Sequence, residues 1–307
     1  MTNPNISTPL KDIRLEAAHV EAAFALSAEA GWNQTRADWQ WMLRHGEGFG
    51  LVDADGSLLA SALALPFDGP CAWISMVLVT TRWQRKGLAT RLTQRAMAAC
   101  AARGLTPLLD ATPAGHDVYR ALGFCDGPGF ARWSRATPVT APPVTPANAA
   151  VQASPAFVAP AIRLQALREE DWPALAALDR VAFGANRLPL LRALAARQPA
   201  LARVAWAQDA PCGFLLARDG RSATQLGPLV ASDEATACAL LASILSEVSG
   251  PVYVDAFHAH QRVQDLLEQA GFSLQRPFTR MAHAPGGGAF AFTPVTSYFV
   301  AAGPELG

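Results

Sequence analysis

The sequence predicts an α/β fold in which two similar domains follow one another, each with a mixed, mostly antiparallel central sheet flanked by helices. The chain has 307 residues, more than one domain usually holds. Strand-like and helix-like patterns alternate along it, and four landmarks recur in the same order. The pairs, at offsets between 145 and 151 residues, are Ile13-Arg14-Leu15 with Ile162-Arg163-Leu164, Leu78-Val79 with Leu229-Val230, Leu109-Asp110-Ala111 with Val254-Asp255-Ala256, and Gly123-Phe124 with Gly271-Phe272. Such order indicates a duplicated domain, against the alternative that dipeptides recur by chance in an Ala/Leu-rich chain.

A linker is predicted between the two copies. Residues 137–160 are rich in Pro and Ala and contain no charged residue, which is typical of a semi-extended connection. The predicted domains are therefore residues 1–136 and 161–307.

The elements of the first copy follow from local patterns. A strand at Ile13–Leu15 precedes an Ala/Leu-rich helix. The Asp-Gly pair at 55–56 favours a hairpin between strands at 49–52 and 58–65, and the β-branched apolar run at 72–80 predicts a buried strand. Leu88, Leu92, Ala96 and Ala99 have helical spacing within a helix predicted over 87–103. A strand at 106–111, a short helix at 116–122 and a last strand from Phe124 complete the copy.

Composition excludes several classes of protein. The 25 Lys and Arg residues balance 25 Asp and Glu residues, and 51% of the chain is hydrophobic, so neither disorder nor a nucleic-acid partner is expected. No apolar stretch approaches the ~20 residues of a membrane span, and the first ten residues lack a secretory pattern. Five scattered cysteines without a CxxC pair favour neither disulfides nor a metal site. These features predict a cytoplasmic protein with no metal and no membrane partner.

The segment Val77–Leu92 carries the chemistry. It combines a buried strand, a short basic turn, a glycine and the start of a helix. The first N–H groups of a helix have no intrahelical acceptor and bind anions. Gly87 lets the backbone approach a ligand, while Arg85 and Lys86 add positive charge. The segment therefore predicts a phosphate-binding turn, although the Walker and dinucleotide GxGxxG patterns are absent.

Two motifs resemble those of the GNAT N-acetyltransferase superfamily. Gln84-Arg85-Lys86-Gly87-Leu88-Ala89 is similar to the family's Q/R-x-x-G-x-G/A loop, which binds the acyl-CoA pyrophosphate, and Tyr119-Arg-Ala-Leu-Gly-Phe124 resembles its Y-x-x-x-G-F segment. The resemblance implies acetyl-CoA as cosubstrate. The positions that it assigns to CoA binding are Val77, Leu78, Val79, Gln84, Arg85, Lys86, Gly87, Leu88, Ala89 and Thr90.

The resemblance also assigns catalytic roles. Tyr119 would protonate the departing CoA thiolate, the alternative being an ordinary residue of an amphipathic helix. Asp110, at the end of a strand, is the candidate general base, although an Asp there often caps the next loop instead. Trp32, Asn33 and His116 are candidate contacts of the acceptor. The alternatives are that Trp32 belongs to the core and that His116 is a surface or cap residue.

The second copy departs from this pattern. After Leu229-Val230 no glycine or arginine follows, and Asp233 and Glu234 stand at the predicted helix start. Carboxylates there satisfy the helix dipole and repel a pyrophosphate. Leu267 occupies the position of Tyr119. We therefore expect a degenerate GNAT-like domain, resembling the C-terminal domain of a bacterial group of tandem GNAT proteins, that walls the acceptor site. Asp255, His258 and His260 indicate a polar pocket in it.

Together these features predict an acetyl-CoA-dependent N-acyltransferase that acts on the amine of a small molecule by direct attack in a ternary complex. A catalytically silent acyl-CoA sensor or protein-interaction module, and a purely structural tandem fold, are the alternatives. A monomer or a homodimer is expected.

Overall fold

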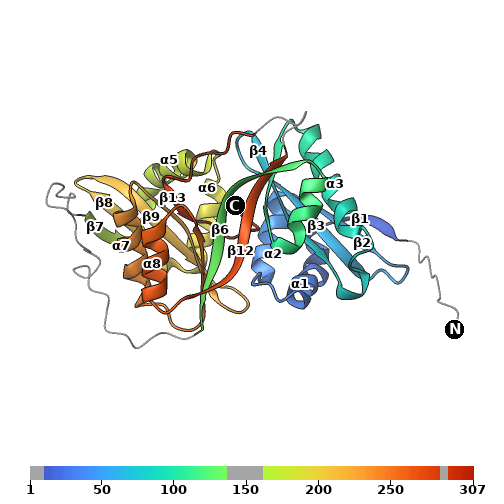
Figure 1. Ribbon diagram of the computed structural model, residues 1–307, viewed down its shortest axis with the longest axis horizontal. Coiled ribbons are helices and arrows are strands. Elements are labelled where there is room, and N and C mark those ends of the chain that lie inside the picture. Colours follow the sequence, from blue (N-terminus) through green and yellow to red (C-terminus); the bar gives the residue numbers. More distant parts are fainter. Residues whose placement is uncertain (1–9, 137–161, 284–289) are drawn as a thin grey trace. The chain divides into compact units, whose positions relative to one another are not determined.

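The computed structural model describes residues 10–136, 162–283 and 290–307. They pack into two compact units (Figure 1). The N-terminal unit comprises Met1–Pro66 and Pro70–Leu109, and the C-terminal unit comprises Phe67–Gly69 and Asp110–Gly307. In the described parts of the chain, no helix is long and apolar enough to cross a membrane.

The N-terminal unit contains a sheet of order β1-β2-β3-β4-β5, antiparallel except for the parallel pair β4–β5. The last two residues of β5 belong to the C-terminal unit. Helix α3 packs against β3 and β4. The elements are β1 (Lys11–Leu15), α1 (Val20–Glu29), α2 (Arg36–His45), β2 (Glu47–Val52), β3 (Leu58–Pro66), β4 (Cys71–Val79), α3 (Leu88–Ala102) and β5 (Thr106–Ala111), with short 3₁₀ turns at Ala17–His19 and Thr81–Trp83.

Helix α2 is the one element of this unit that the sequence patterns did not predict. It begins with a capping box, in which the Thr35 hydroxyl accepts from the Asp38 amide and the Asp38 carboxylate accepts from the Thr35 amide. Trp39 and Met42 of this helix are fully buried. A Thr followed three residues later by an acid was the available signal.

Strands β4 and β5 pair only at one end. Their ladder runs from Cys71–Thr106 to Trp73–Leu108. Just beyond, Met76 has a φ of 50°, and the register with β3 shifts between Ser61 and Leu63. The buried Ser61 hydroxyl donates to the Met76 carbonyl at 2.8 Å and stabilises this bulge. The end of β4 that leads into the predicted anion-binding turn is therefore not hydrogen-bonded to β5.

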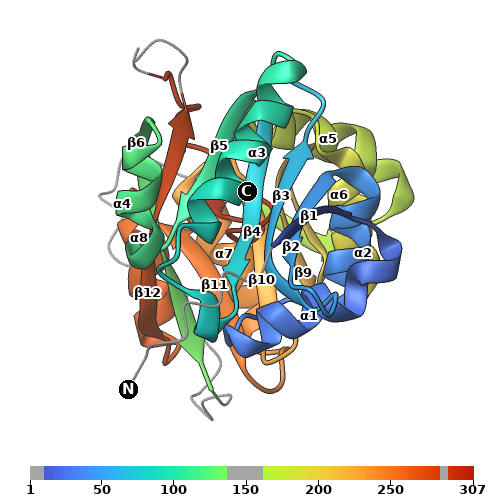
Figure 2. The ribbon, with the colours of Figure 1, turned by 90° about the vertical axis from the view of Figure 1, so that its right-hand side faces the viewer.

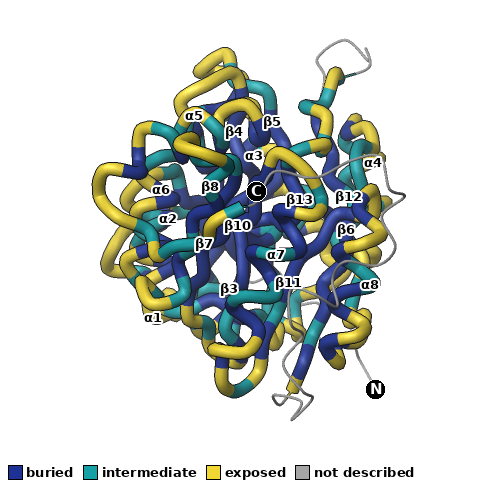
Figure 3. The backbone as a smooth tube through the Cα atoms, turned by 90° about the vertical axis from the view of Figure 1, so that its left-hand side faces the viewer, coloured by how far each residue is buried: buried dark blue, intermediate teal, exposed yellow. Residues whose placement is uncertain are grey.

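The C-terminal unit contains a sheet of order β12-β6-β11-β13-β10-β9-β8-β7, with β10 also paired to β11. Its elements are α4 (Pro113–Ala121), β6 (Phe124–Arg135), β7 (Ile162–Ala166), α5 (Trp172–Phe183), α6 (Leu188–Arg197), β8 (Arg203–Ala207), β9 (Ala210–Arg218), β10 (Thr224–Ala231), α7 (Glu234–Leu245), β11 (Val252–Phe257), α8 (Gln261–Gln269), β12 (Ser273–His283) and β13 (Tyr298–Val300), with 3₁₀ turns at Glu169–Asp171 and Pro199–Leu201. In Figure 3 the tube is dark blue along β10 and β11, which lie in the apolar core.

Strand β6 closes the first sequence repeat but pairs with two strands of the second. It is antiparallel to β11 on one side and to β12 on the other, and Figure 2 shows β6 and β12 side by side. Packing therefore divides the chain between Leu109 and Asp110, not at the predicted linker. The predicted domain limits at 136 and 161 describe sequence repeats and stay a prediction, and all of the linker lies outside the described residues.

Candidate functional site

The turn before α3 has the backbone conformation of an anion-binding loop. Gly87 precedes the helix with a φ of 78°, and Arg85 has a φ of 59°. No side chain caps the helix, and no acid occupies its first turn. A Cβ built on Gly87 would meet nothing within 4 Å. Among the described residues, no side chain caps the first amides of α3, which is the requirement for binding a phosphate there.

Basic side chains remain available around this turn. Arg85 and Lys86 are exposed, and the Lys86 ammonium lies 4.5 Å from the centre of the Trp83 ring. Farther along α3, both Arg91 and Arg95 pair with Asp12 of β1. The single Asp12 carboxylate offsets part of the charge of these two helix arginines, whereas Arg85 and Lys86 at the turn are exposed.

Glu29, at the end of α1, braces the entry to the turn. Its carboxylate accepts from the Thr80 hydroxyl at 2.9 Å and from the Thr81 amide at 2.8 Å. These hydrogen bonds hold the pKa of Glu29 below its usual value. Gln84 also donates its side-chain amide to the carbonyl of Val79 at 3.3 Å. The sequence patterns did not identify Glu29, because nothing local places the end of α1 beside residues 80 and 81.

Helix α4 carries Tyr119 in a packed setting of the C-terminal unit. The helix begins at Thr112, whose hydroxyl accepts from the Gly115 amide. Tyr119 is half-buried, with its ring 6.0 Å from that of Phe124, and a Cβ on Gly115 would lie 2.9 Å from it. Burial raises the pKa of the Tyr119 phenol to about 12. Tyr119 therefore keeps its proton throughout the physiological range, as a proton donor must.

Asp110 forms a buried ion pair at the end of β5. Its fully buried carboxylate accepts from Nε and Nη2 of Arg280 at 2.9 and 3.1 Å. Burial, opposed by the Arg280 charge, raises the pKa of Asp110 to about 6. The equivalent Asp255 of the second repeat forms the same pair with Arg132, at 2.8 and 2.7 Å. Because the second repeat has the same pair, a structural role in packing is sufficient to explain the Asp110–Arg280 pair. The role of Asp110 as a general base stays a prediction.

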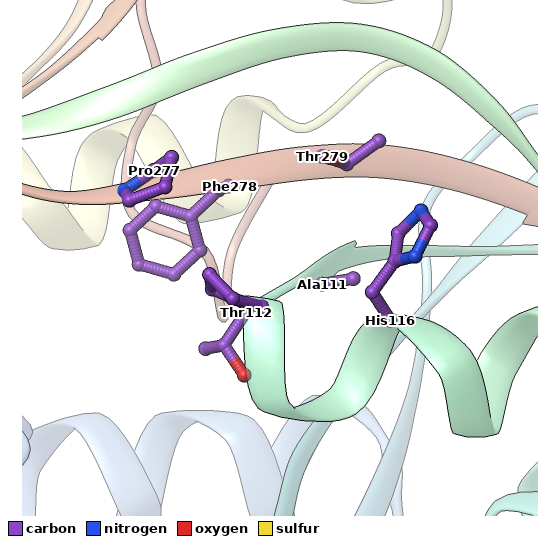
Figure 4. Close-up of a pocket in the computed structure, with 7 residues that line it drawn as sticks. Ala111, Thr112, His116, Pro277, Phe278 and Thr279 are labelled. Atoms are coloured by element: carbon purple, nitrogen blue, oxygen red, sulfur yellow. The ribbon is translucent and has the colours of Figure 1, made fainter.

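His116 lines a hollow of about 300 Å³ in the C-terminal unit. Residues 111–113 and His116 form one side, and Pro277–Thr279 of β12 form the other (Figure 4). The His116 Nε2 lies 2.9 Å from a carboxylate oxygen of Asp126. The hollow thus combines the first-repeat helix of Tyr119 with a second-repeat strand.

The other predicted acceptor contacts lie between α1 and α2 in the N-terminal unit. Asn33 is buried, and Trp32 is half-buried, with its amide bonded to the Ser27 carbonyl. Because Trp32 is half-buried, part of its side chain belongs to the core, as the alternative interpretation holds. Their contact with an acceptor stays a prediction.

Comparisons with known proteins agree with this arrangement. Residues 15–124 match a model described as the acetyltransferase (GNAT) family, and residues 175–287 match one described as an acetyltransferase (GNAT) domain. The chain contains two GNAT domains in tandem.

The similarity to a relative and to solved structures covers most of the chain. The uncharacterized N-acetyltransferase YitH of Bacillus subtilis is 26% identical over 267 residues, which cover 85% of this chain and 86% of YitH. A crystal structure from Pyrococcus horikoshii has a TM-score of 0.73 at 17% identity and covers 100% of this chain and 99% of its own. A tandem GNAT protein from the clavulanic acid biosynthesis pathway has a TM-score of 0.62 at 16% identity, covering 92% and 100%. At these identities, the two structures show the shared fold.

The second GNAT domain has its helix starts occupied by its own carboxylates. The Asp233 carboxylate accepts from the Thr236 amide at 2.8 Å and caps α7. The carboxylate of Glu234 accepts from the Arg262 amide at 2.8 Å, at the start of α8. The prediction that acids satisfy this helix start is confirmed for Asp233. Leu267, which replaces Tyr119, is fully buried in the core.

The structure does not group Asp255, His258 and His260 into the predicted polar pocket. Asp255 is paired with Arg132 and receives a hydrogen bond from Gln225 at 3.1 Å. His260 is bound through Nε2 to the carbonyls of Val295 and Tyr298. Asp255 and His260 are therefore bonded to partners within the unit, and His258 is exposed. The described residues contain no cluster of three His, Cys, Asp or Glu side chains suited to a metal.

Proposed function

We propose that this chain is an acetyl-CoA-dependent N-acetyltransferase whose acceptor is the amine of a small molecule. The observation that carries the proposal is the open start of α3, where Gly87 leaves the helix amides uncapped. The match of residues 15–124 to the GNAT family supports it. The equivalent helix start in the second domain is capped by Asp233, so the proposal assigns the cosubstrate to the first domain alone.

The residues present fit the cosubstrate. Residues 84–90 would hold its pyrophosphate through backbone amides and the Arg85 and Lys86 charges. Val77, Leu78 and Val79 lie on β4 beyond its ladder with β5, so their backbone groups on that edge are suited to the pantetheine amides. Bound acetyl-CoA would supply the acyl thioester.

Tyr119 is proposed to hold the proton that the thiolate leaving group requires. Its phenol, with a pKa of about 12, stays protonated while a neutral amine attacks. In direct attack, the amine nitrogen forms the amide bond as the C–S bond of the thioester breaks, so no nucleophilic residue of the chain is needed. The thiolate takes the proton of Tyr119, and the proton that the nitrogen loses returns to the phenolate through solvent. General acid catalysis of this kind typically contributes ~10²–10⁴ in rate.

The proposal is tested by following free thiol with acetyl-CoA and a panel of amines. In Tyr119→Phe we expect kcat to fall about 100-fold or more, with the CoA dissociation constant within about twofold of wild type, since the phenol acts on the leaving group. Tyr253→Phe, which removes the hydroxyl of a half-buried tyrosine on β11, is the control. Release of no thiol with any amine, despite CoA binding, would favour the silent acyl-CoA-binding alternative.

A further inference from the structure

The hollow between α4 and β12 has the composition of a binding site for an apolar group. Its floor and walls include Ala111, Pro113, Pro277 and Phe278, and its polar atoms come from His116 and two threonines. In Figure 4 the Phe278 ring lies next to Thr112, and His116 extends from α4 toward Thr279. A volume of about 300 Å³ is at the lower end of small-molecule sites and suits one side chain of a ligand.

The hollow adjoins the face of α4 that carries Tyr119. His116 and Tyr119 are three residues apart in the helix, so they share one face. The rise between them is roughly 4.5 Å. A ligand group seated against His116 therefore lies within one helical turn of the proposed proton donor.

Arg276 is an unpaired cation next to this hollow. Its guanidinium lies 4.9 Å from the centre of the Phe278 ring. Its Nε is buried without a hydrogen-bond partner, and with the described residues it forms no salt bridge. Burial and the charge of neighbouring Arg132 lower the pKa of Arg276, and the charge of Asp255 opposes them only in part. A partly desolvated guanidinium without a counter-ion is unfavourable, and an anion that pairs with it would stabilise it.

Among the described residues, the two neighbouring arginines each have a carboxylate partner, whereas Arg276 has none. Arg276 is paired in register with Arg132 of β6, and Arg280 lies four residues farther along β12. Arg132 binds Asp255 and Arg280 binds Asp110, each in a bidentate manner. Arg276 is thus the guanidinium of this group whose counter-ion the described chain does not provide.

We propose that the acceptor is an amino acid or a similar amine bearing a carboxylate, with Arg276 binding the carboxylate and the hollow between α4 and β12 receiving an apolar side chain. This inference rests on the proposed function, because it names the acceptor class of that reaction. It makes the second GNAT domain part of substrate recognition, through one arginine and three residues of β12.

The test compares matched pairs of acceptors that differ only in the carboxylate. Phenylalanine, leucine and methionine are each measured against their amides, with acetyl-CoA and detection of free thiol. We expect at least one free amino acid to have a KM roughly tenfold or more below that of its amide, as a charge-assisted hydrogen bond predicts. In Arg276→Gln this preference should disappear with little change in KM for the amide, and Arg276→Lys should restore part of it.

Arg163→Gln is the matched control, since Arg163 also lies over an aromatic ring, that of Trp206, but on exposed β7. It should keep the wild-type preference. Equal KM values for every acid and amide pair in wild type, or a preference retained in Arg276→Gln, would overturn the assignment of Arg276. The wild-type comparison decides this even if the variant does not fold.

Failure of the proposed function gives a different result. If no acceptor releases thiol, calorimetric titration of the same three amino acids and amides tests the site without turnover. Binding of the acid, weak binding of the amide and loss of acid binding in Arg276→Gln would retain the carboxylate site and refute the transferase. Equal or absent binding of acid and amide would refute the site as well.

Discussion

The starts of α3 and α7 follow equivalent strands of two GNAT domains, yet they present opposite surfaces to a ligand. Gly87 leaves the amides of α3 open, with Arg85 and Lys86 beside them. Asp233 fills the same place at α7 with its own carboxylate. The same strand, turn and helix can therefore bind an anion or exclude one, and the choice depends on a few turn residues, because the amides themselves are identical.

A second comparison shows what the two domains still share. Asp110 and Asp255 are equivalent, and each binds the equivalent arginine of the other repeat, Arg280 or Arg132. The exchange is reciprocal because β6 lies between β11 and β12. In the second domain Asp233 caps the equivalent helix start, while the buried pair is present in both domains.

Removing one partner of these buried pairs should produce the largest change. Asp255→Asn is expected to lower the unfolding free energy by about 3–5 kcal/mol, because the buried Arg132 guanidinium loses its counter-ion. Urea unfolding measures it. Glu169→Gln, which breaks the exposed pair with Arg192, should cost under about 1 kcal/mol. Equal effects of the buried and the exposed variant would show that burial does not increase the cost of breaking the pair.

Closing the start of α3 should abolish the difference between the two domains. In Gly87→Glu we expect the CoA affinity to fall about 100-fold or more, because a carboxylate enters the phosphate position. Gly104→Glu is the control: Gly104 has a φ of 66° and, like Gly87, open space around a Cβ. It imposes similar backbone strain at the other end of the helix. Similar loss of CoA binding in both variants would point to strain as the cause.

The Asp110 pair should also make stability depend on pH. Burial raises the pKa of Asp110 from 3.8 to about 6, so between these values the folded chain holds this proton more tightly than the unfolded chain. The unfolding free energy contributed by Asp110 should therefore fall as pH rises through this window, with a limiting slope of about 1.4 kcal/mol per pH unit. The measurement is the difference between wild type and Asp110→Asn in urea midpoints at pH 4, 5, 6 and 7. A difference that stays constant across these pH values would contradict the shift.

Opening the start of α7 should have the smallest effect. Asp233→Ala removes a helix cap and should lower the unfolding free energy by roughly 1 kcal/mol. CoA binding should not change, because the second domain also lacks the glycine and the basic residues of the first. A second CoA site in the variant, seen as a doubled stoichiometry by calorimetry, would show that the cap alone excludes the ligand.

Local patterns were sufficient for most elements and for the anion-binding turn. The Asp55-Gly56 hairpin, the helix from Gly87 and the strand–helix–strand order after it depend on contacts within a few residues, so the sequence carries them directly. The repeated landmarks predicted a duplicated domain, and the two GNAT domains in tandem confirm it. Helix α2 was missed although its capping box and the helical spacing of Trp39 and Met42 were both present in the sequence.

The sequence by itself distinguished the two helix starts, since Gly87 has no side chain to cap α3 and Asp233 caps α7. Only the tertiary structure decided the partners of Asp110 and Asp255, the brace from Glu29 to the turn and the hollow beside Arg276. These contacts join residues up to 170 positions apart. The two aspartate pairs and the hollow depend on which strands β6 pairs with, and that pairing is set by burial across a whole sheet rather than by any local propensity.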